Sequence, residues 1–430
     1  CWELRDLARR VYEHDNVEIV LHSLPTEACN ELIDNLLECE GGEEISESVR
    51  ALIRERSGGN PLFIEEVVRS LIDRGVLERS GERWQVVGQV PANYIPDTLH
   101  GVISARLDRL DPIARRTLQI GAVIGHTFSS RILQLVAQGN GDLTHQLVHL
   151  QRAEIIREVR RGAEQAYTFT HTLTQQVAYE TLLRRQRREY HHRVAQSIEK
   201  LYANRLEEHY ERLAYHYAGA TDWPRALDYH IKFATQARLR FANDKAGEHY
   251  QRAWEIVQSG RAGDEGTQLL LHESQANLDF LSGDHQTATI RYEEALGLAK
   301  EPPDLARLFR KLGDVFHALG DCERAAWYLE QGVDVAETIG RGPELASLYV
   351  GLGQVHHRQG NYQKATELGL LSLEIFEKVD NQPGTALASN LLGIVFWAMG
   401  DLGAACSYLE KSLLIRASLG DVHGLAAAYN

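Results

Sequence analysis

The strongest constraint in the sequence is a 40-residue period that runs through its second half. In each unit, a Leu-Gly pair lies about two helical turns before a glycine that is followed by aspartate or asparagine. The recurring residues are Pro303, Pro343 and Pro383; Gly313, Gly353 and Gly393; Gly320, Gly360 and Gly400; and Ala325, Ala365 and Ala405. A fixed period of this length indicates a stack of similar units rather than one compact core.

The motifs of each unit predict two helices joined by a tight turn. Proline is tolerated in the first turn of a helix, because the N–H that it lacks would have no partner there. Glycine adopts the left-handed conformation that ends a helix at low cost, and the aspartate or asparagine after it caps the next helix. We therefore predict turns at Gly320, Gly360 and Gly400. Small residues such as Gly313 and Ala325 should lie where the paired helices pack closely.

This pattern resembles the tetratricopeptide repeat (TPR), in the longer form found in bacterial regulators. Earlier units are degenerate: Gly283 is followed by matching small and aromatic residues, whereas Phe241 stands where glycine is usual. The resemblance implies an α-solenoid over residues 201–430 that binds a protein, a peptide or a small effector. Because the pattern continues to Asn430 without a capping helix, we expect the array to be truncated at its C-terminal end.

Composition excludes several classes of function. The 430 residues include 46 basic and 60 acidic ones, a net charge of -14. Nucleic-acid binding needs basic surface, so broad DNA or RNA contact is not expected. No apolar run reaches the roughly 18 residues that cross a bilayer, so no membrane contact is expected. The five cysteines are widely spaced and form no C-x-x-C motif, which favours free thiols in the cytoplasm over disulfides or a metal site.

The first half of the chain predicts a different architecture. Residues 17–24 are expected to form a strand, and a small lid-like bundle of three helices follows over 25–37, 44–56 and 61–74. A hairpin is expected at 76–90. Further helices are expected over 97–110, 112–123, 129–138 and 142–152, and two short strands then flank Gly162. Three helices followed by a two-stranded wing form a winged-helix-like module.

Three stretches of the first half resemble the lid and winged-helix modules of bacterial STAND-class signalling ATPases. They are SGGNPLFIEEVVRSLIDRGVL, IPDTLHGVISARLDRLDPIARRTLQIGAVIGHTF and YTFTHTLTQQVAYETLL. The fold class is thus expected to be mainly α. The resemblance divides the chain into three parts: the end of a nucleotide-binding core plus a helical lid (residues 1–78), a winged-helix-like module (79–200) and the TPR array (201–430).

The same resemblance implies conditional roles for a few residues. In that family a glycine-x-proline in the lid packs on the nucleotide base, and Gly59-Asn60-Pro61 stands at that place. A winged-helix histidine contacts the ADP phosphate, and His171 stands there, with Thr170 and Thr172 replacing the methionine and aspartate of the family motif. No G-x-x-x-x-G-K-[ST] loop occurs. The parent protein is therefore expected to supply the missing nucleotide-binding core in cis, with ATP or ADP and Mg²⁺. This chain should bind no cofactor and catalyse nothing.

Local chemistry offers simpler interpretations of the same residues. Gly59-Asn60-Pro61 could be only a helix boundary, and His171 only a hydrogen-bonded residue at a strand-to-helix junction. The basic run Arg184–Arg188 is expected to be a solvated helix face. The adjacent carboxylates Glu65 and Glu66 are expected to point apart and to lie on the surface.

Two functions from different classes follow. In the first, the chain is the regulatory and sensor portion of a STAND-type ATPase, whose repeats bind an effector and control a nucleotide switch. In the second, it is a stand-alone TPR adaptor or a winged-helix transcription regulator without ATPase activity. The chain begins at Cys1 and its single methionine is Met399, so we expect it to be part of a longer protein.

Overall fold

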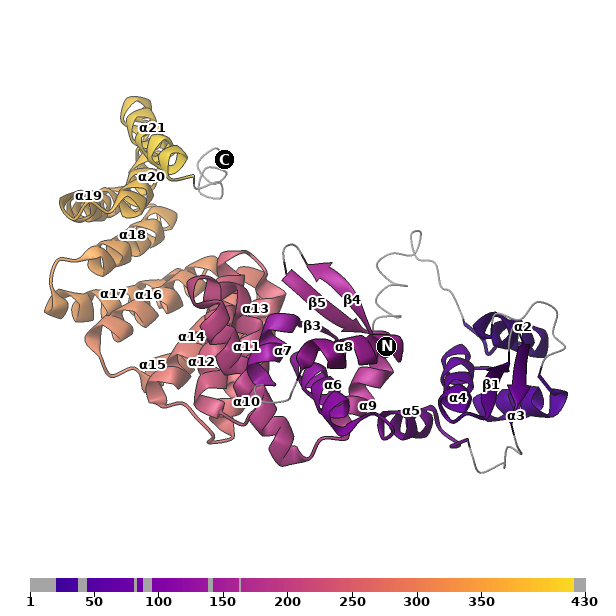
Figure 1. Ribbon diagram of the computed structural model, residues 1–430. Helices are drawn as coiled ribbons and strands as arrows, with labels where there is room; N and C mark the ends of the chain where they lie inside the picture. The colour runs from indigo at the N-terminus through magenta and orange to yellow at the C-terminus, as the bar shows by residue number, and fades with distance from the viewer. Residues whose placement is uncertain are drawn as a thin grey trace. The chain divides into compact units, whose positions relative to one another are not determined.

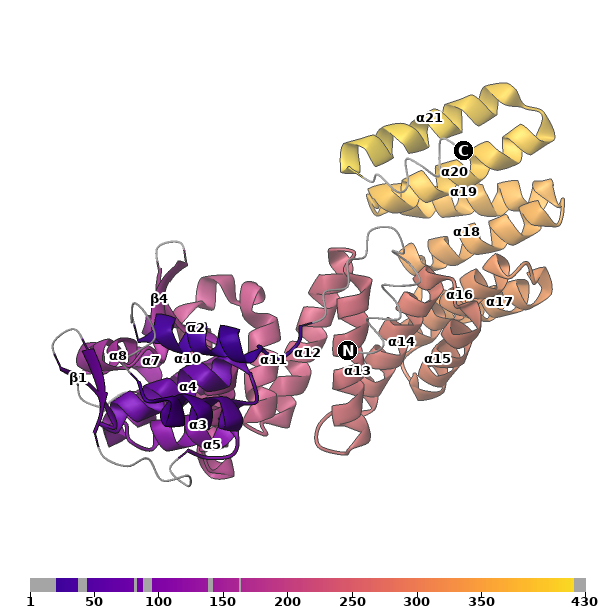
Figure 2. The same cartoon turned by 90° about the vertical axis from the view of Figure 1, so that its right-hand side faces the viewer.

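A computed structural model of the chain describes residues 21–37, 45–80, 83–87, 95–137, 142–161 and 164–420. The chain divides into two compact units, residues 1–201 and 202–430 (Figures 1 and 2). As expected, the described residues are mainly helical, with only two small sheets. No helix within these ranges is both long enough and apolar enough to cross a bilayer.

The first unit opens with the predicted three-helix lid. Its helices are α2 (Thr26–Leu36), α3 (Glu47–Ser57) and α4 (Pro61–Asp73), followed by a hairpin of β1 (Leu77–Ser80) and β2 (Arg83–Val86). Apolar residues of all three helices, among them Ile33, Ile53 and Ile64, form one buried cluster. The strand expected at 17–24 is wrong for residues 21–24, which have no strand conformation, and residues 17–20 lie outside the described ranges.

A winged-helix module completes the first unit. Its elements are α5 (Leu99–Leu107), α6 (Pro112–Ile124), β3 (Thr127–Ser129), α7 (Ser130–Val136), α8 (Leu143–Arg152), β4 (Ile156–Arg161), β5 (Glu164–Phe169), α9 (Thr172–Glu180) and α10 (Arg184–Leu201). Strand β3 was not predicted. It pairs antiparallel with β5, so the sheet order is β3-β5-β4. The helix expected over 97–110 begins at Leu99, because Thr98 caps α5 by accepting a bond from the Gly101 N–H at 3.1 Å.

The second unit consists of helical hairpins. After a short 3₁₀ segment (Ala203–His209), it contains α11 (Tyr210–Gly219), α12 (Trp223–Leu239), α13 (Asn243–Gln258), α14 (Glu265–Ser282), α15 (His285–Leu298), α16 (Pro302–Ala318), α17 (Cys322–Ile339), α18 (Pro343–Arg358), α19 (Tyr362–Lys378), α20 (Gln382–Met399) and α21 (Leu402–Leu419). Consecutive first helices pack together, α16 on α18 and α18 on α20. Consecutive second helices in the described array make no comparable contact. The first helices therefore form the inner layer of the array.

The turns between paired helices have the predicted chemistry. Gly320, Gly360 and Gly400 have φ of 81°, 78° and 86°, in the left-handed region. The next residue in each case, Asp321, Asn361 or Asp401, accepts a bond from the N–H three positions further on. Each turn thus ends one helix and caps the next within two residues.

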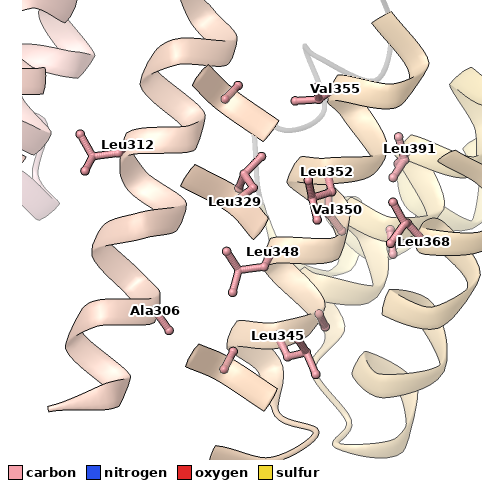
Figure 3. Packing of buried hydrophobic residues seen from close by; sticks show 14 of the residues in the cluster. Ala306, Leu312, Leu329, Leu345, Leu348, Val350, Leu352, Val355, Leu368 and Leu391 are labelled. Atoms are coloured by element: carbon pink, nitrogen blue, oxygen red, sulfur yellow. The ribbon is translucent and has the colours of Figure 1, made fainter. Parts of the chain in front are cut away.

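The repeated small residues lie where neighbouring helices approach closely, both within a hairpin (α16 and α17) and between hairpins (α18 and α20). A Cβ added to Gly313 would lie 2.5 Å from Cγ of Leu329, and one added to Gly353 would lie 2.5 Å from Cδ2 of Leu391. Leucine side chains therefore occupy the space that a larger residue would need. Figure 3 shows how such leucines from successive hairpins meet in one continuous core. Ala325, Ala365 and Ala405 are all buried in equivalent places.

Candidate functional site

The Gly59-Asn60-Pro61 segment forms the sharp turn into α4. Gly59 has φ of 75°, and a Cβ at this position would lie 2.6 Å from the Leu24 carbonyl oxygen. The Leu24 N–H donates to the Gly59 carbonyl at 2.9 Å. Pro61 opens the helix, and Oδ1 of Asn60 accepts bonds from the N–H groups of Leu62 and Phe63 at 3.1 and 3.3 Å. The segment thus has a structural role as the start of α4, and its contact with a nucleotide base stays a prediction.

His171 lies immediately before α9, and its side chain does not cap that helix. Its Nε2 atom lies 3.5 Å from Oε2 of Glu65 on α4. The Nε2 atom is buried and has no hydrogen-bond partner among the described residues. The structure therefore brings His171 to the helix that Asn60 and Pro61 begin, about one turn further along it.

Two arginines tie the lid to the winged-helix module around this histidine. Arg69 of α4 pairs with Glu65 at 2.7 Å and also with Glu154, in the turn between α8 and β4. Arg106 of α5 donates to both carboxylate oxygens of Glu66, at 3.1 and 3.0 Å. Its guanidinium also donates to the Ala153 carbonyl and lies 3.4 Å from Asp73.

The expectation that Glu65 and Glu66 both lie on the surface is wrong. Glu66 is 1% exposed, and Glu65 faces Arg69 and His171 at the junction. A carboxylate can be buried if an equally buried cation satisfies it, and Arg106, 6% exposed, does so. The four-residue spacing of Glu65 and Arg69 was visible in the sequence, but nothing local indicated that Arg106, 40 residues away, pairs with Glu66.

The charge balance at the junction disfavours an anion. Four carboxylates, those of Glu65, Glu66, Asp73 and Glu154, surround two arginines, and His171 faces one of these carboxylates. A phosphate placed beside His171 would meet Glu65 at close range. Contact of His171 with a nucleotide phosphate stays a prediction about the parent protein.

A cavity of about 350 Å³ opens beside this network. Residues of α2, α4, α5 and the α8–β4 turn line it, including Leu36, Val68, Arg69, Arg106 and Glu154. Across the described residues, no three histidine, cysteine, aspartate or glutamate side chains gather to hold a metal ion. The junction thus offers ionic contacts between two modules but no metal centre.

The inner layer of the array is the second candidate site. Arg307 on α16 binds Glu273 on α14 through two bonds of 2.9 and 3.0 Å, and Arg310 binds Glu344 on α18 at 2.6 Å. Desolvation raises the pKa of the Asp314 carboxyl. Because 37% of this side chain is still exposed, Asp314 lies on a recessed part of the surface rather than in the core. Burial, followed by the Arg310 charge, lowers the pKa of Lys311.

The same layer becomes apolar toward the end of the described chain. On α20, the exposed side chains include Leu387, Ile394 and Trp397. A 310 Å³ cavity between α20 and α21 is lined by Pro383, Ala386, Leu387, Arg416 and Leu419. An inner surface that is charged at α14–α16 and apolar at α20 can contact a partner with both kinds of side chain.

Two histidines that sequence patterns did not single out lie buried in the first full hairpin. Nδ1 of His230 on α12 lies 3.1 Å from Nδ1 of His249 on α13. Burial, reinforced by positive neighbours including Arg252, lowers the pKa of each to about 4. For a bond between these two atoms, one ring must carry a proton on Nδ1 and the other must leave its Nδ1 free to accept, as two neutral rings of opposite tautomer do. Protonation of both rings removes the acceptor, so the pair stabilises the hairpin at neutral pH.

Comparisons with known proteins agree with the repeat architecture. The family model described as "Tetratricopeptide repeat" matches residues 344–418, and a domain of unknown function (DUF8739) matches residues 25–78. No curated protein matches the sequence.

Among solved structures, the chain is similar to a Signal Transduction ATPase with Numerous Domains (STAND) protein with a tetratricopeptide repeat sensor from Pyrococcus horikoshii. The identity is 15% and the TM-score 0.51, over 95% of this chain and 56% of the other. The chain thus spans about half of that protein's length. BtubC from P. vanneervenii matches at 22% identity, over 52% of this chain and 92% of the other, with a TM-score of 0.41. The Rap conjugation gene regulator of plasmid pLS20, solved with the Phr* peptide, matches at 16% identity, over 47% of this chain and 56% of the other, with a TM-score of 0.43. These findings show a tetratricopeptide-repeat protein whose fold resembles that of a STAND protein.

Proposed function

We propose that this chain is the regulatory and sensor portion of a cytoplasmic STAND-type signal-transduction ATPase. One observation carries the proposal: the chain shares the fold of a STAND protein with a TPR sensor over 95% of its length. The nucleotide-binding core, with ATP or ADP and Mg²⁺, would belong to the rest of the parent protein. The chain itself would catalyse nothing.

In this proposal the array binds a protein or peptide effector on its inner layer. The charged stretch on α14–α16 would recognise polar side chains, and Leu387, Ile394 and Trp397 would receive apolar ones. Effector binding would shift the balance between two arrangements of the lid and the winged-helix module. The ionic contacts of Arg69 and Arg106 would belong to one of these arrangements.

Two measurements test the proposal. The encoded sequence before Cys1 should contain a P-loop in the same reading frame, whereas a start codon directly before Cys1 would support the stand-alone adaptor. Calorimetric titration of this chain with Mg-ATP should show no tight binding. Micromolar affinity would mean that a nucleotide site lies within these residues and that the core is not elsewhere.

A further inference from the structure

The cavity between the lid and the winged-helix module has both charged and apolar walls. Its volume of about 350 Å³ lies at the small end of the roughly 300–1,000 Å³ that small-molecule sites occupy. Helices α2 and α4 supply the apolar part, which consists of Leu36, Val68 and Ile72. Neither Gly59-Asn60-Pro61 nor His171 lines it. The cavity is therefore separate from the residues to which the STAND resemblance gives nucleotide contacts.

The charged wall contains an arginine without an ionic partner. Arg152 ends α8 and is exposed, and its side chain forms no ion pair or hydrogen bond with any residue that the structure describes. Arg69, on the α4 side, forms ion pairs through Nη2, but its Nη1 atom is buried and has no hydrogen-bond partner within the same ranges. A guanidinium presents paired N–H groups that match the two oxygens of a carboxylate. The two arginines can therefore receive a carboxylate from a ligand.

Two carboxylates of the same cavity remain accessible to a cation. The side chains of Asp73 and Glu154 are 45% and 62% exposed. Asp73 lies 3.4 Å from Nε of Arg106, and this Nε atom forms no hydrogen bond with the described residues. Because this ion pair is loose, Asp73 keeps lone pairs that an ammonium group can use. This part of the cavity can therefore receive an ammonium group.

The charge of the surroundings limits what the ligand can be. With Arg152 included, three arginines face four carboxylates, those of Glu65, Glu66, Asp73 and Glu154. A ligand of net negative charge would add to this excess, whereas a ligand with balanced charges would not. The walls thus favour a molecule that carries one carboxylate, one ammonium group and a small apolar body.

We propose that this cavity binds a zwitterion of the amino-acid type with an aliphatic side chain. Its carboxylate pairs with Arg152 and Arg69, its ammonium group pairs with Asp73, and its side chain covers Val68 and Ile72. Because α4 belongs to the lid and α8 to the winged-helix module, the bound ligand holds the two modules together and stabilises this arrangement. Every contact comes from this chain, so the site does not depend on the proposed nucleotide-binding core.

Calorimetric titration of the whole chain with L-leucine tests the proposal. We expect saturable binding with a Kd below about 1 mM. Leucinamide lacks the carboxylate and isocaproate lacks the ammonium group. Each analogue should bind at least about tenfold more weakly, because hydrogen bonds between charged groups contribute at least that factor.

Three variants assign the binding to this cavity. Arg152→Gln removes the unpaired guanidinium without breaking a contact, and should weaken L-leucine at least about tenfold while leaving leucinamide unchanged. The matched control is Arg157→Gln, an exposed arginine of the same module that does not line the cavity, and its affinity for L-leucine should stay within about twofold. Asp73→Asn should bring the affinities for L-leucine and isocaproate closer together. Circular dichroism shows whether each variant is folded.

Several results would overturn the assignment. They are no binding at about 10 mM L-leucine, equal affinity for L-leucine and both analogues, or equal loss in Arg152→Gln and Arg157→Gln. Tighter binding of inorganic phosphate than of L-leucine would also overturn it, because the arginines would then serve an anion. None of these results bears on the search for a P-loop before Cys1, so failure of this site and failure of the proposed function are distinguishable.

Discussion

Replacing Arg106 with methionine should destabilise the junction between the lid and the winged-helix module. The guanidinium is 6% exposed and binds Glu66, which is 1% exposed, through two bonds of 3.1 and 3.0 Å. Methionine fills much of the same volume but leaves the carboxylate buried without a partner, and removing one member of a buried pair costs about 3–5 kcal/mol. The Ala153 carbonyl also loses its donor, which adds about 1 kcal/mol.

Hydrogen exchange resolved along the chain is the appropriate assay, because a protein of two units does not unfold in one step. In Arg106→Met, the amides of α4 and α5 should exchange through an opening reaction easier by about 4–6 kcal/mol, the sum of these two losses. The double variant Arg106→Met/Glu66→Leu removes both charges and should recover most of the loss. A single variant that costs less than about 1 kcal/mol, or a double variant no more stable than the single one, would refute this account of the pair.

Three further predictions concern the array. Ala365→Leu should overpack the hairpin of α18 and α19 by about 1–3 kcal/mol, measured by urea denaturation, whereas an unchanged midpoint would show that the site can expand. Thr221 has φ of 60°, which strains a β-branched residue, so Thr221→Gly should raise stability by about 0.5–1 kcal/mol, and a lower melting temperature would contradict this. The folded-state pKa of His230 and of His249 is about 4, against about 6.5 in the unfolded chain, so their stabilising contribution should be complete above pH 6.5 and lost as pH falls toward 4. The opening free energy of α12 and α13, measured by hydrogen exchange, should fall between pH 6.5 and 4. In His230→Gln/His249→Gln this fall should be much smaller, and an equal fall in the variant and the unaltered chain would exclude the pair as its cause.

Local chemistry was enough to predict most elements, and the misses have physical causes. Asn60-Pro61 and Asp111-Pro112 begin helices as expected, because a capping side chain followed by proline specifies a helix start without help from the rest of the fold. Strand β3 has only three residues and exists through its pairing with β5, about 40 residues further along the chain. The prediction that Glu66 lies on the surface is wrong for the same reason, because burial of a charge depends on a partner that is distant in sequence.

The sequence by itself determined the repeat architecture. A glycine that must turn left-handed, a capping side chain after it and small residues at crossing points are all requirements within one 40-residue unit, so the period exposes them directly. Only the tertiary structure decided what surrounds His171 and which groups satisfy Glu66. These properties arise from side chains that lie far apart in sequence, and electrostatic energies depend on the distance and burial that the fold alone sets.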